Sequence, residues 1–232
     1  MKQNLKVFWF EQTISDVPAT DEWLAPAEQE KMRSFRVPKR ASDWRLGRWT
    51  AKRALAHSHN LPGHPAALSA IEIIPADSGV PLAFVQGKPS SCAISISHSQ
   101  GRGACATAPG SAALGCDVER IESRSDAFVS DYFTAEEQDA VARSPLHDRA
   151  ILHTLLWSAK ESAMKALGEG LRLDTRSLSV SRVGQPSPWC LWAPLTVRTA
   201  SGALFEGWWH ADGEFVRTVI ADPGCSEPML RV

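Results

Sequence analysis

The sequence predicts an α+β protein built from two similar halves, and three observations support this expectation. The 232 residues have an ordinary globular composition, with 44% hydrophobic and 22% charged residues, enough for one large or two small domains. Helical and strand-like patterns follow one another in blocks along the chain. A short motif also recurs at a nearly constant offset, which favours an internal repeat.

The repeat consists of short matches that keep the same order in both halves. The motif Trp-Thr-Ala-Lys returns as Trp-Ser-Ala-Lys, and His-Ser-Gln-Gly is echoed by His-Ala-Asp-Gly. We therefore expect two similarly built halves, 1–111 and 112–232, each running strand, helix, strand and then paired strands. The matching segments are 49–52 with 157–160, 98–101 with 210–213, 109–110 with 223–224, and 7–10 with 114–117.

The first half contains one clear helix and two clear strands. Apolar residues at helical spacing predict a helix over 41–57, which a Pro-Gly pair ends. β-Branched residues predict strands over 71–74 and 93–96. The segment 77–79, Asp-Ser-Gly, marks the turn between them.

The second half begins with a strand and then becomes helical. A strand is expected over 112–117, and Thr134 begins a helix because Glu137 completes a capping box with it. The longest helix of the chain is expected over 151–167, where two glycines end it. Further strands are expected over 177–183, 189–193, 204–210 and 215–221.

Charge and hydropathy exclude two classes of partner. Lys and Arg total 25 against 26 Asp and Glu, so no overall basic field draws the protein to nucleic acid or anionic lipid. No apolar run approaches the roughly 18 to 20 residues that span a bilayer, and the first residues lack a secretory signal. We expect a soluble, cytoplasmic protein. Its five scattered cysteines predict reduced thiols rather than disulfides or a zinc site.

Two carboxylates stand at the end of the strand that opens the second half. Asp117 and Glu119 are two residues apart, so in an extended chain both side chains leave the same face of the sheet. Like charges so close repel unless a cation lies between them, which makes Mg²⁺ a natural third partner. Because Arg120, Glu122 and Arg124 continue a charged stretch, a solvated loop remains the alternative.

A second charged group lies on the long helix of this half. Trp157, Glu161 and Lys165 follow at intervals of four and share one helix face, while Lys160 points about a quarter turn away. A Glu with a Lys four residues on is also the commonest exposed helix pair. The apolar neighbours favour burial, and a buried carboxylate and ammonium need partners.

These residues carry a resemblance to a known family. Segments 113–119 (ALGCDVE) and 157–165 (WSAKESAMK) resemble the paired signature of the 4'-phosphopantetheinyl transferases. The likeness extends to 94–99, to the turn Gly79-Val80-Pro81 and to 30–35, and so covers most of the chain. It is strongest to the larger, surfactin-synthetase-activating (Sfp) type, a single chain of two similar halves, rather than to the half-length acyl-carrier-protein synthase type.

The resemblance implies a fold and a reaction. Two similar α/β subdomains would be related by a pseudo-twofold axis, with residues 1–111 binding the 3'-phosphate side of coenzyme A and 112–232 holding the metal and the catalytic acids. The protein would act as a monomer that transfers the 4'-phosphopantetheine arm of coenzyme A to a serine of an apo carrier protein, whether acyl, peptidyl or aryl. The transfer would require Mg²⁺, with Mn²⁺ possible, and release adenosine 3',5'-bisphosphate.

The resemblance also implies roles for individual residues. Asp117, Glu119 and Glu161 would hold the metal, and Glu161 would take the serine proton directly or through water. Lys165 would be catalytic by placing a cation against the pyrophosphate. His98, flanked by Ser97 and Ser99, would bind the 3'-phosphate where hydroxyls and imidazole converge. The residues expected to contact the coenzyme are Lys31, Arg45, Ser97, His98, Lys160 and Lys165.

Several positions remain open at this point. The family often has Lys where this chain has Val80, and Lys39 and Arg40 could compensate for the missing cation. Glu137 corresponds to a carboxylate sometimes placed near the metal, although its capping box explains it equally well. Lys160 could either contact a phosphate of the coenzyme or have a purely structural role. A basic and apolar surface between Arg120 and Arg149, with Phe128 and Phe133, is the expected docking site for the carrier.

Two other functions compete with phosphopantetheinyl transfer. The same three acids could direct water in place of serine, which would make the protein a Mg²⁺-dependent hydrolase of nucleotide-like diphosphates. A coenzyme-binding or carrier-binding module without activity is the second alternative. The missing lysine at Val80 keeps it open, whereas the presence of Asp117, Glu119, Glu161 and Lys165 argues against it.

Overall fold

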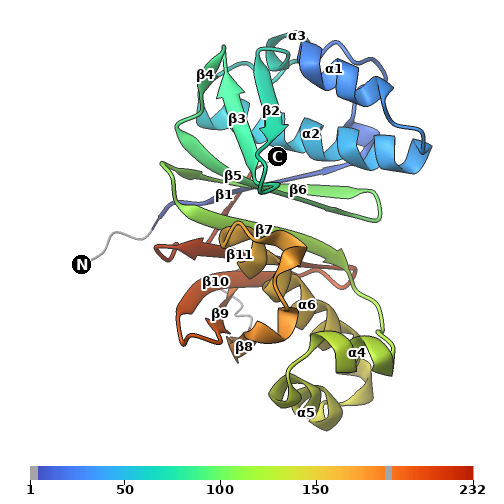
Figure 1. The fold of residues 1–232 in the computed structure, drawn as a ribbon, viewed down its shortest axis with the longest axis vertical. Coiled ribbons are helices and arrows are strands. Elements are labelled where there is room, and N and C mark those ends of the chain that lie inside the picture. Colours follow the sequence, from blue (N-terminus) through green and yellow to red (C-terminus); the bar gives the residue numbers. More distant parts are fainter. Residues whose placement is uncertain (1–4, 186–189, 232) are drawn as a thin grey trace.

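The structure is a computed structural model that describes residues 5–185 and 190–231, except for the side chain of Leu171. It is an α+β protein in which three sheets and their helices follow one another along the longest axis (Figure 1). Trp189, at the beginning of the strand predicted over 189–193, lies outside the described residues. In the described part of the chain, no helix combines the length and the apolar character that crossing a membrane requires.

The first half places a long helix, α2, on a sheet of short strands. Strand β1 pairs with β6, and β6 pairs with β5, both antiparallel, while β2, β3 and β4 form a separate sheet. The elements of this half are β1 (Phe8–Thr13), α1 (Pro26–Arg33), α2 (Pro38–Ser58), α3 (Pro65–Leu68), β2 (Ile71–Pro75), β3 (Pro81–Val85), β4 (Lys88–Pro89), β5 (Cys92–Ser99) and β6 (Arg102–Pro109).

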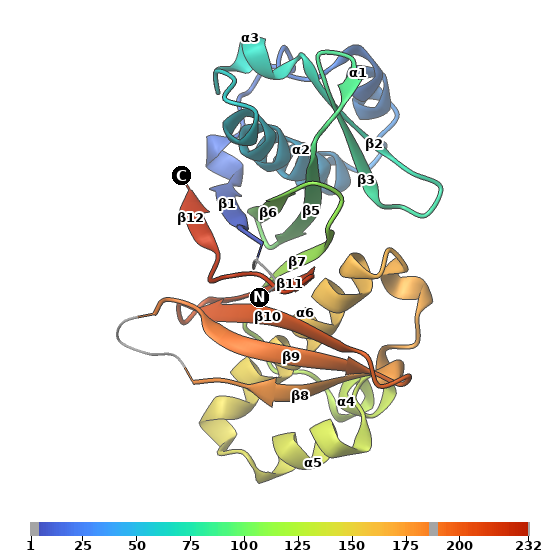
Figure 2. The same cartoon turned by 90° about the vertical axis from the view of Figure 1, so that its left-hand side faces the viewer.

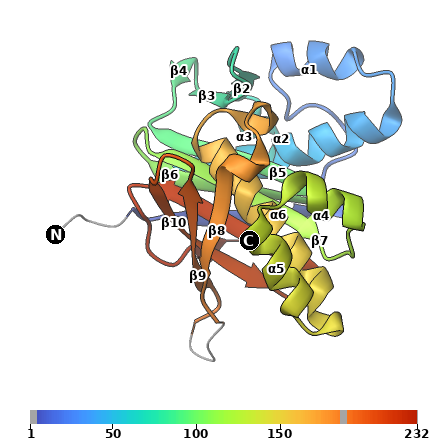
Figure 3. The ribbon, with the colours of Figure 1, turned by 60° about the horizontal axis from the view of Figure 1, so that its bottom comes forward.

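The second half consists of a five-stranded sheet with three helices. The strand order is β7-β11-β10-β9-β8, and α4 and α5 lie beside α6 at one end of the molecule (Figures 1 and 3). The elements are β7 (Ala113–Arg120), α4 (Asp126–Tyr132), α5 (Ala135–Arg143), α6 (Arg149–Ala166), β8 (Leu178–Val183), β9 (Ala193–Thr199), β10 (Leu204–Ala211) and β11 (Phe215–Asp222).

The two main sheets begin and end alike. In each, the first strand of the half pairs antiparallel with the last strand, β1 with β6 and β7 with β11, and the last strand pairs with the one before it. The final strand β12 (Met229–Arg231) departs from this order because it returns to the first sheet and runs parallel to β1. Figure 2 shows the first sheet between α2 and the second sheet.

Most of the elements predicted from sequence are present, and three expectations need correction. The helix expected over 151–167 is α6, but α2 with 21 residues is longer than α6 with 18. The strand expected over 189–193 is wrong, since β9 begins at Ala193. Strand β6 went unpredicted because its small residues carry little strand propensity. These small residues allow α2 to pack closely on β6, since a Cβ at Gly103 would clash with Leu46 and Thr50 of α2.

Helix α6 crosses β7 so closely that position 115 has no room for a side chain. A Cβ on Gly115 would overlap the backbone carbonyl of Ser162. Small polar residues continue this contact, because the Ser162 and Ser158 hydroxyls lie 2.7 and 2.9 Å from the Thr218 hydroxyl of β11. The close crossing brings the side chains near the end of α6 next to those of β7.

The repeated Trp-x-Ala-Lys motif makes a buried ion pair in the first half. Lys52 of α2 is fully buried and pairs with Glu28, which caps α1 by accepting from the Ala25 N–H at 2.9 Å. Glu28 also accepts from the Ile73 N–H of β2 at 3.2 Å, and Lys52 donates to the Trp23 carbonyl at 2.9 Å. One ion pair therefore ties a helix start, a helix interior and a strand together.

The second half repeats this arrangement with the matching residues. Lys160 of α6 is fully buried and pairs with Glu137 at 2.7 Å, while Glu137 accepts from the Thr134 N–H at 2.8 Å and from the Val180 N–H of β8 at 2.9 Å. Lys160 also donates to the carbonyls of Tyr132 and Thr175 at 3.0 and 3.1 Å. The internal repeat seen in the sequence thus preserves a pair of structural ion pairs.

Candidate functional site

A row of serine side chains joins the two main sheets. Strands β5 and β7 lie side by side without backbone pairing, and alternate residues of β5 point toward β7. The Ser97 hydroxyl donates to Asp117 Oδ1, which fixes that buried carboxylate. The three contacts are the Cys116 N–H to Ser95 Oγ (2.9 Å), Ser97 Oγ to Asp117 Oδ1 (2.7 Å) and Ser99 Oγ to Glu119 Oε2 (2.9 Å).

The three predicted acids lie close enough to influence one another. Burial, and then the charge of Asp117, raises the pKa of Glu119 to about 7. The same two causes, in the same order, raise the pKa of Glu161 on α6 to about 7. Asp117 is buried, and its Oδ2 has no hydrogen-bond partner among the described residues. The structure therefore concentrates negative charge at the boundary between the sheets.

Lys165 is the counter-ion of this acidic group. Its ammonium donates to Asp117 Oδ1 at 2.8 Å and to the Cys116 carbonyl at 3.0 Å, and lies 3.6 Å from Glu161 Oε2. Burial acts to lower the pKa of Lys165, but the charges of Asp117 and Glu161 outweigh it and raise this pKa. The lysine is thus a firmly charged cation between two of the acids.

The three acids have the chemistry that a hard divalent ion requires, but their side chains are not arranged around one metal position. Carboxylate oxygens suit Mg²⁺, and the partnerless Oδ2 of Asp117 together with two carboxyl groups of raised pKa indicates a shortage of positive charge. Within residues 5–185 and 190–231, however, no group of three or more His, Cys, Asp or Glu side chains is placed to hold a metal. Lys165 lies between Asp117 and Glu161 instead.

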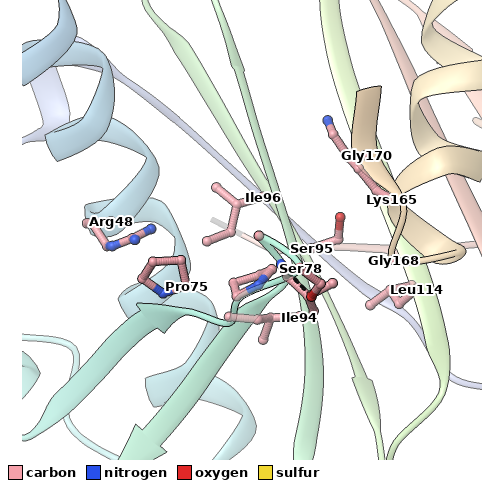
Figure 4. A pocket seen from close by; sticks show the side chains of 13 residues that line it. Arg48, Pro75, Ser78, Ile94, Ser95, Ile96, Leu114, Lys165, Gly168 and Gly170 are labelled. Carbon is pink, nitrogen blue, oxygen red and sulfur yellow. Dashed lines mark hydrogen bonds between the residues drawn. The ribbon is translucent and has the colours of Figure 1, made fainter. Parts of the chain in front are cut away.

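A cavity of about 280 Å³ opens beside Lys165, between the two halves. Figure 4 shows Arg48 of α2 and Lys165 on opposite sides of β5, which supplies Ile94, Ser95 and Ile96 to the wall between them. The turn between β2 and β3 and the loop after α6 complete the lining, and no acid takes part. Arg48 lies 3.7 Å from Glu28 and Lys165 pairs with Asp117, but neither carboxylate lines the cavity, so the two cations favour an anionic ligand there.

A wider groove of about 600 Å³ continues from this cavity. The two share Val80, Ile94, Leu114 and Lys165, and the groove then runs along apolar residues such as Leu82 of β3 and Leu167. Both Leu82 and Leu167 are exposed, so the groove is open to solvent. A ligand with a charged end and a long uncharged end matches this succession of surfaces.

His98 does not converge with its neighbouring serines, contrary to the sequence-based expectation. Successive side chains of a strand leave opposite faces, so Ser97 and Ser99 face β7 while His98 lies against Gly47 of α2. One edge of the ring is exposed. Partial burial lowers the pKa of His98, Lys165 acts in the same direction and Asp43 opposes them. The imidazole is therefore a neutral hydrogen-bonding group at pH 7.

Of the six predicted coenzyme contacts, Lys165 lines the cavity, whereas the other five do not: Lys31, Arg45, Ser97, His98 and Lys160. Lys31 is exposed and stacks on Phe35, while Arg45 points to the other side of α2, where it donates to the Pro18 carbonyl and pairs with Asp21. Lys160 is fully buried in its ion pair, so it takes the structural one of its two predicted roles. The same pair accounts for Glu137, which caps α5 and does not approach the metal acids.

The predicted carrier-docking surface at 120–149 is not basic. This segment holds seven Asp or Glu residues against four Arg, and Phe133 is fully buried. Exposed cations gather instead at the end of α1 and the start of α2, where Lys31, Arg33, Arg36, Lys39 and Arg40 occur with no acid among them. Neither Lys39 nor Arg40 lines the cavity beside Val80.

Arg48 and Ser95 line the cavity, and neither was singled out from the sequence. The signal for Ser95 was present in the sequence, because serines alternate at 95, 97 and 99 and mark one polar face of a strand. Arg48 precedes the repeated Trp-x-Ala-Lys motif, and nothing in its spacing separates it from Arg45. Only the rotation of α2 decides which arginine faces the cavity.

Comparison with known proteins identifies the region that contains the acids. Residues 113–213 match the 4'-phosphopantetheinyl transferase superfamily. The chain is thus similar to that superfamily over less than half of its length. The matched residues include Asp117, Glu119, Glu161 and Lys165, whereas Arg48 and His98 lie outside them.

One curated relative supports the assignment to this superfamily. The holo-acyl-carrier-protein synthase of Jannaschia sp. (strain CCS1) is 38% identical over 78 residues, which are 30% of this chain and 51% of that protein. The chain thus spans about half the length of the curated relative that it matches.

Proposed function

We propose that the protein transfers the 4'-phosphopantetheine arm of coenzyme A to a serine of an apo carrier protein. The observation that carries this proposal is the meeting of Asp117, Glu119 and Glu161 with Lys165 at one end of an acid-free, cation-lined cavity. The match of residues 113–213 to the superfamily and the similarity to a holo-acyl-carrier-protein synthase support the same reaction class.

The surfaces beside the acids suit the two ends of coenzyme A. Arg48 and Lys165 would face its phosphates across the cavity, and the apolar groove would receive the uncharged pantetheine arm. His98, at the α2 side of β5, would donate a hydrogen bond to the 3'-phosphate. First-half residues would therefore bind the nucleotide while second-half residues perform the transfer.

We further propose that Asp117, Glu119 and Glu161 hold Mg²⁺, or Mn²⁺, when coenzyme is bound. The ion would neutralise charge on the diphosphate. Lys165 must then leave Asp117 and turn its ammonium toward the phosphate oxygens, where it stabilises the charge that develops on the leaving group. Glu161 would accept the proton of the attacking serine hydroxyl, directly or through water. The serine–phosphorus bond forms as the anhydride bond breaks and adenosine 3',5'-bisphosphate leaves.

The finer assignments are proposals of the same kind. We assign the chain to the Sfp-type, acting as a monomer in the cytoplasm, with 1–111 as the nucleotide-binding subdomain and 112–232 as the catalytic subdomain. The carrier is an acyl, peptidyl or aryl carrier protein.

Mass spectrometry tests the reaction directly. Several apo carriers are incubated with the protein, coenzyme A and Mg²⁺, and one carrier is expected to gain a single phosphopantetheine. Coenzyme A cleaved without any carrier would instead indicate the diphosphate hydrolase. Coenzyme binding with neither outcome would indicate a binding module.

Replacing His98 with Ala should weaken coenzyme binding more than turnover. Without the imidazole the protein loses a hydrogen bond to the 3'-phosphate, so we expect a Kd for coenzyme A raised about tenfold. Calorimetry with coenzyme A and its 3'-dephospho form measures this, and the variant should distinguish the two less than the unmodified protein does. An unchanged preference would exclude the 3'-phosphate role. His147→Ala, at an exposed position, is the control.

Stability of the metal-free protein should fall as pH rises. In the folded protein Glu119 and Glu161 keep their protons up to about pH 7, but in the unfolded chain they release them near their ordinary pKa of 4.5. The free energy of unfolding therefore decreases as the pH rises from about 4.5 to about 7. Mg²⁺ competes with those protons and should raise the melting temperature more at about pH 8 than at about pH 6. Thermal unfolding with and without Mg²⁺ measures this, and equal shifts would contradict it.

A further inference from the structure

The loop after α6 closes over the turn between β2 and β3. Helix α6 ends at Ala166, and the Gly168 N–H donates to the Lys165 carbonyl at 3.0 Å. Gly168 has φ +73°, which only glycine adopts readily. Gly168 packs near Val80 of the turn, and both line the cavity. The loop from the second half and the turn from the first half thus form one rim of the cavity.

Arg172 connects the two sides of this rim. Its guanidinium donates to the Ser78 carbonyl of the turn at 3.0 Å and to the carbonyls of Glu169 and Gly168 in its own loop at 3.1 and 3.4 Å. Ser78 and Gly168 both line the cavity. Arg172 does not itself line the cavity, but hydrogen bonds to Ser78 and Gly168 hold it next to two residues that do.

The charge of Arg172 is not neutralised by these contacts. All three partners are backbone carbonyls, and in the described part of the chain no carboxylate forms an ion pair with it. Arg176, four residues on, differs because Asp174 pairs with it at 3.3 Å. Arg172 is also exposed, so its remaining N–H groups are accessible. An exposed guanidinium with fixed orientation and no counter-ion suits a phosphate.

We propose that Arg172 is the third cation of the cavity and binds the phosphate oxygens of its ligand. Arg48 and Lys165 supply charge from two walls, whereas Val80 leaves the turn itself without a cation. Arg172 reaches this turn from the second half and places the missing charge beside it. The proposal takes the identity of the ligand, coenzyme A, from the proposed function. The position of the charge comes from the structure alone.

Coenzyme A binding to the full chain, without carrier protein, tests the proposal by calorimetry. Arg172→Gln keeps a donor for the Ser78 carbonyl but removes the charge, and we expect its Kd to rise about tenfold with a weaker dependence on salt. Val80→Lys in the Arg172→Gln background should restore most of the affinity. Arg176→Ala removes an exposed arginine that pairs with Asp174 rather than with the turn at Ser78, and it should leave the Kd unchanged.

The outcomes separate this proposal from the proposed function. If the unmodified protein binds coenzyme A and Arg172→Gln binds it equally well with the same salt dependence, the inference is wrong. Arg172 then only connects the loop to the turn by hydrogen bonds. If the unmodified protein does not bind coenzyme A at all, both the proposed function and the inference fail. Melting temperatures verify that each variant is folded, and Arg172→Lys, which keeps the charge, should retain more affinity than Arg172→Gln.

Discussion

Replacing Glu161 with Gln should reduce phosphopantetheinyl transfer by at least about 10³-fold while leaving the fold intact. The substitution removes a proposed metal oxygen and the proposed base, but the side chain keeps its shape. In the metal-free protein the ionised form of Glu161 is destabilised, since burial and the charge of Asp117 raise its pKa to about 7. We therefore expect the melting temperature at about pH 8 to be equal to or above that of the unmodified protein.

Transfer to a carrier, followed by mass spectrometry, and thermal unfolding measure the two effects of Glu161→Gln. Asp117→Ala should lose transfer as well, although Ser97 and Lys165 then also lose a hydrogen-bond acceptor. Glu136→Gln, at an exposed position of α5, is the matched control and should keep full activity. Labelling near the unmodified rate by Glu161→Gln would remove the basis of the proposed function.

Replacing Lys160 with Met should destabilise the protein by about 3–5 kcal/mol, because it leaves the carboxylate of Glu137 buried without its counter-ion. The carbonyls of Tyr132 and Thr175 lose their donor at the same time. Urea titration measures the loss of the free energy of unfolding. Lys52→Met should cost less in the first half, since Arg48 lies 3.7 Å from Glu28 and remains as a counter-ion.

A double variant separates the buried charge from the packing around it. Lys160→Met combined with Glu137→Gln removes both charges, so it should recover part of the stability that Lys160→Met loses. Below the unfolding transition, Lys160→Met should bind coenzyme A with an unchanged Kd. A variant of normal stability that bound coenzyme A poorly would return Lys160 to the phosphate role suggested by the resemblance.

The cluster of acids with Lys165, which we propose to be catalytic, could be predicted from the sequence because its residues belong to two regular elements. The spacing of Asp117 and Glu119 fixes one face of a strand, and the spacing of Glu161 and Lys165 fixes one face of a helix. Each pair is set by local geometry. The structure then brings the pairs together through the close crossing of α6 over β7 at Gly115.

The nucleotide side could not be predicted in the same way. Arg45 and Arg48 are three residues apart on α2, and only its packing turns Arg48 to the cavity and Arg45 to the loop at Pro18. The spacing of Lys160 allowed either a structural or a phosphate contact, and burial beside Glu137 decided between them. Arg172 gave no sequence signal, since its importance comes from a turn about ninety residues away in the chain.

The sequence alone determined the α+β class, most of the elements, the internal repeat and the acidic residues, because these follow from periodicity and from side-chain chemistry along one continuous segment. Tertiary structure decided which cations face the cavity, which carboxylate forms an ion pair with a lysine, and which serine hydroxyl lies against which carboxylate. Those outcomes depend on the rotation of helices and on contacts between distant segments, which local spacing does not specify.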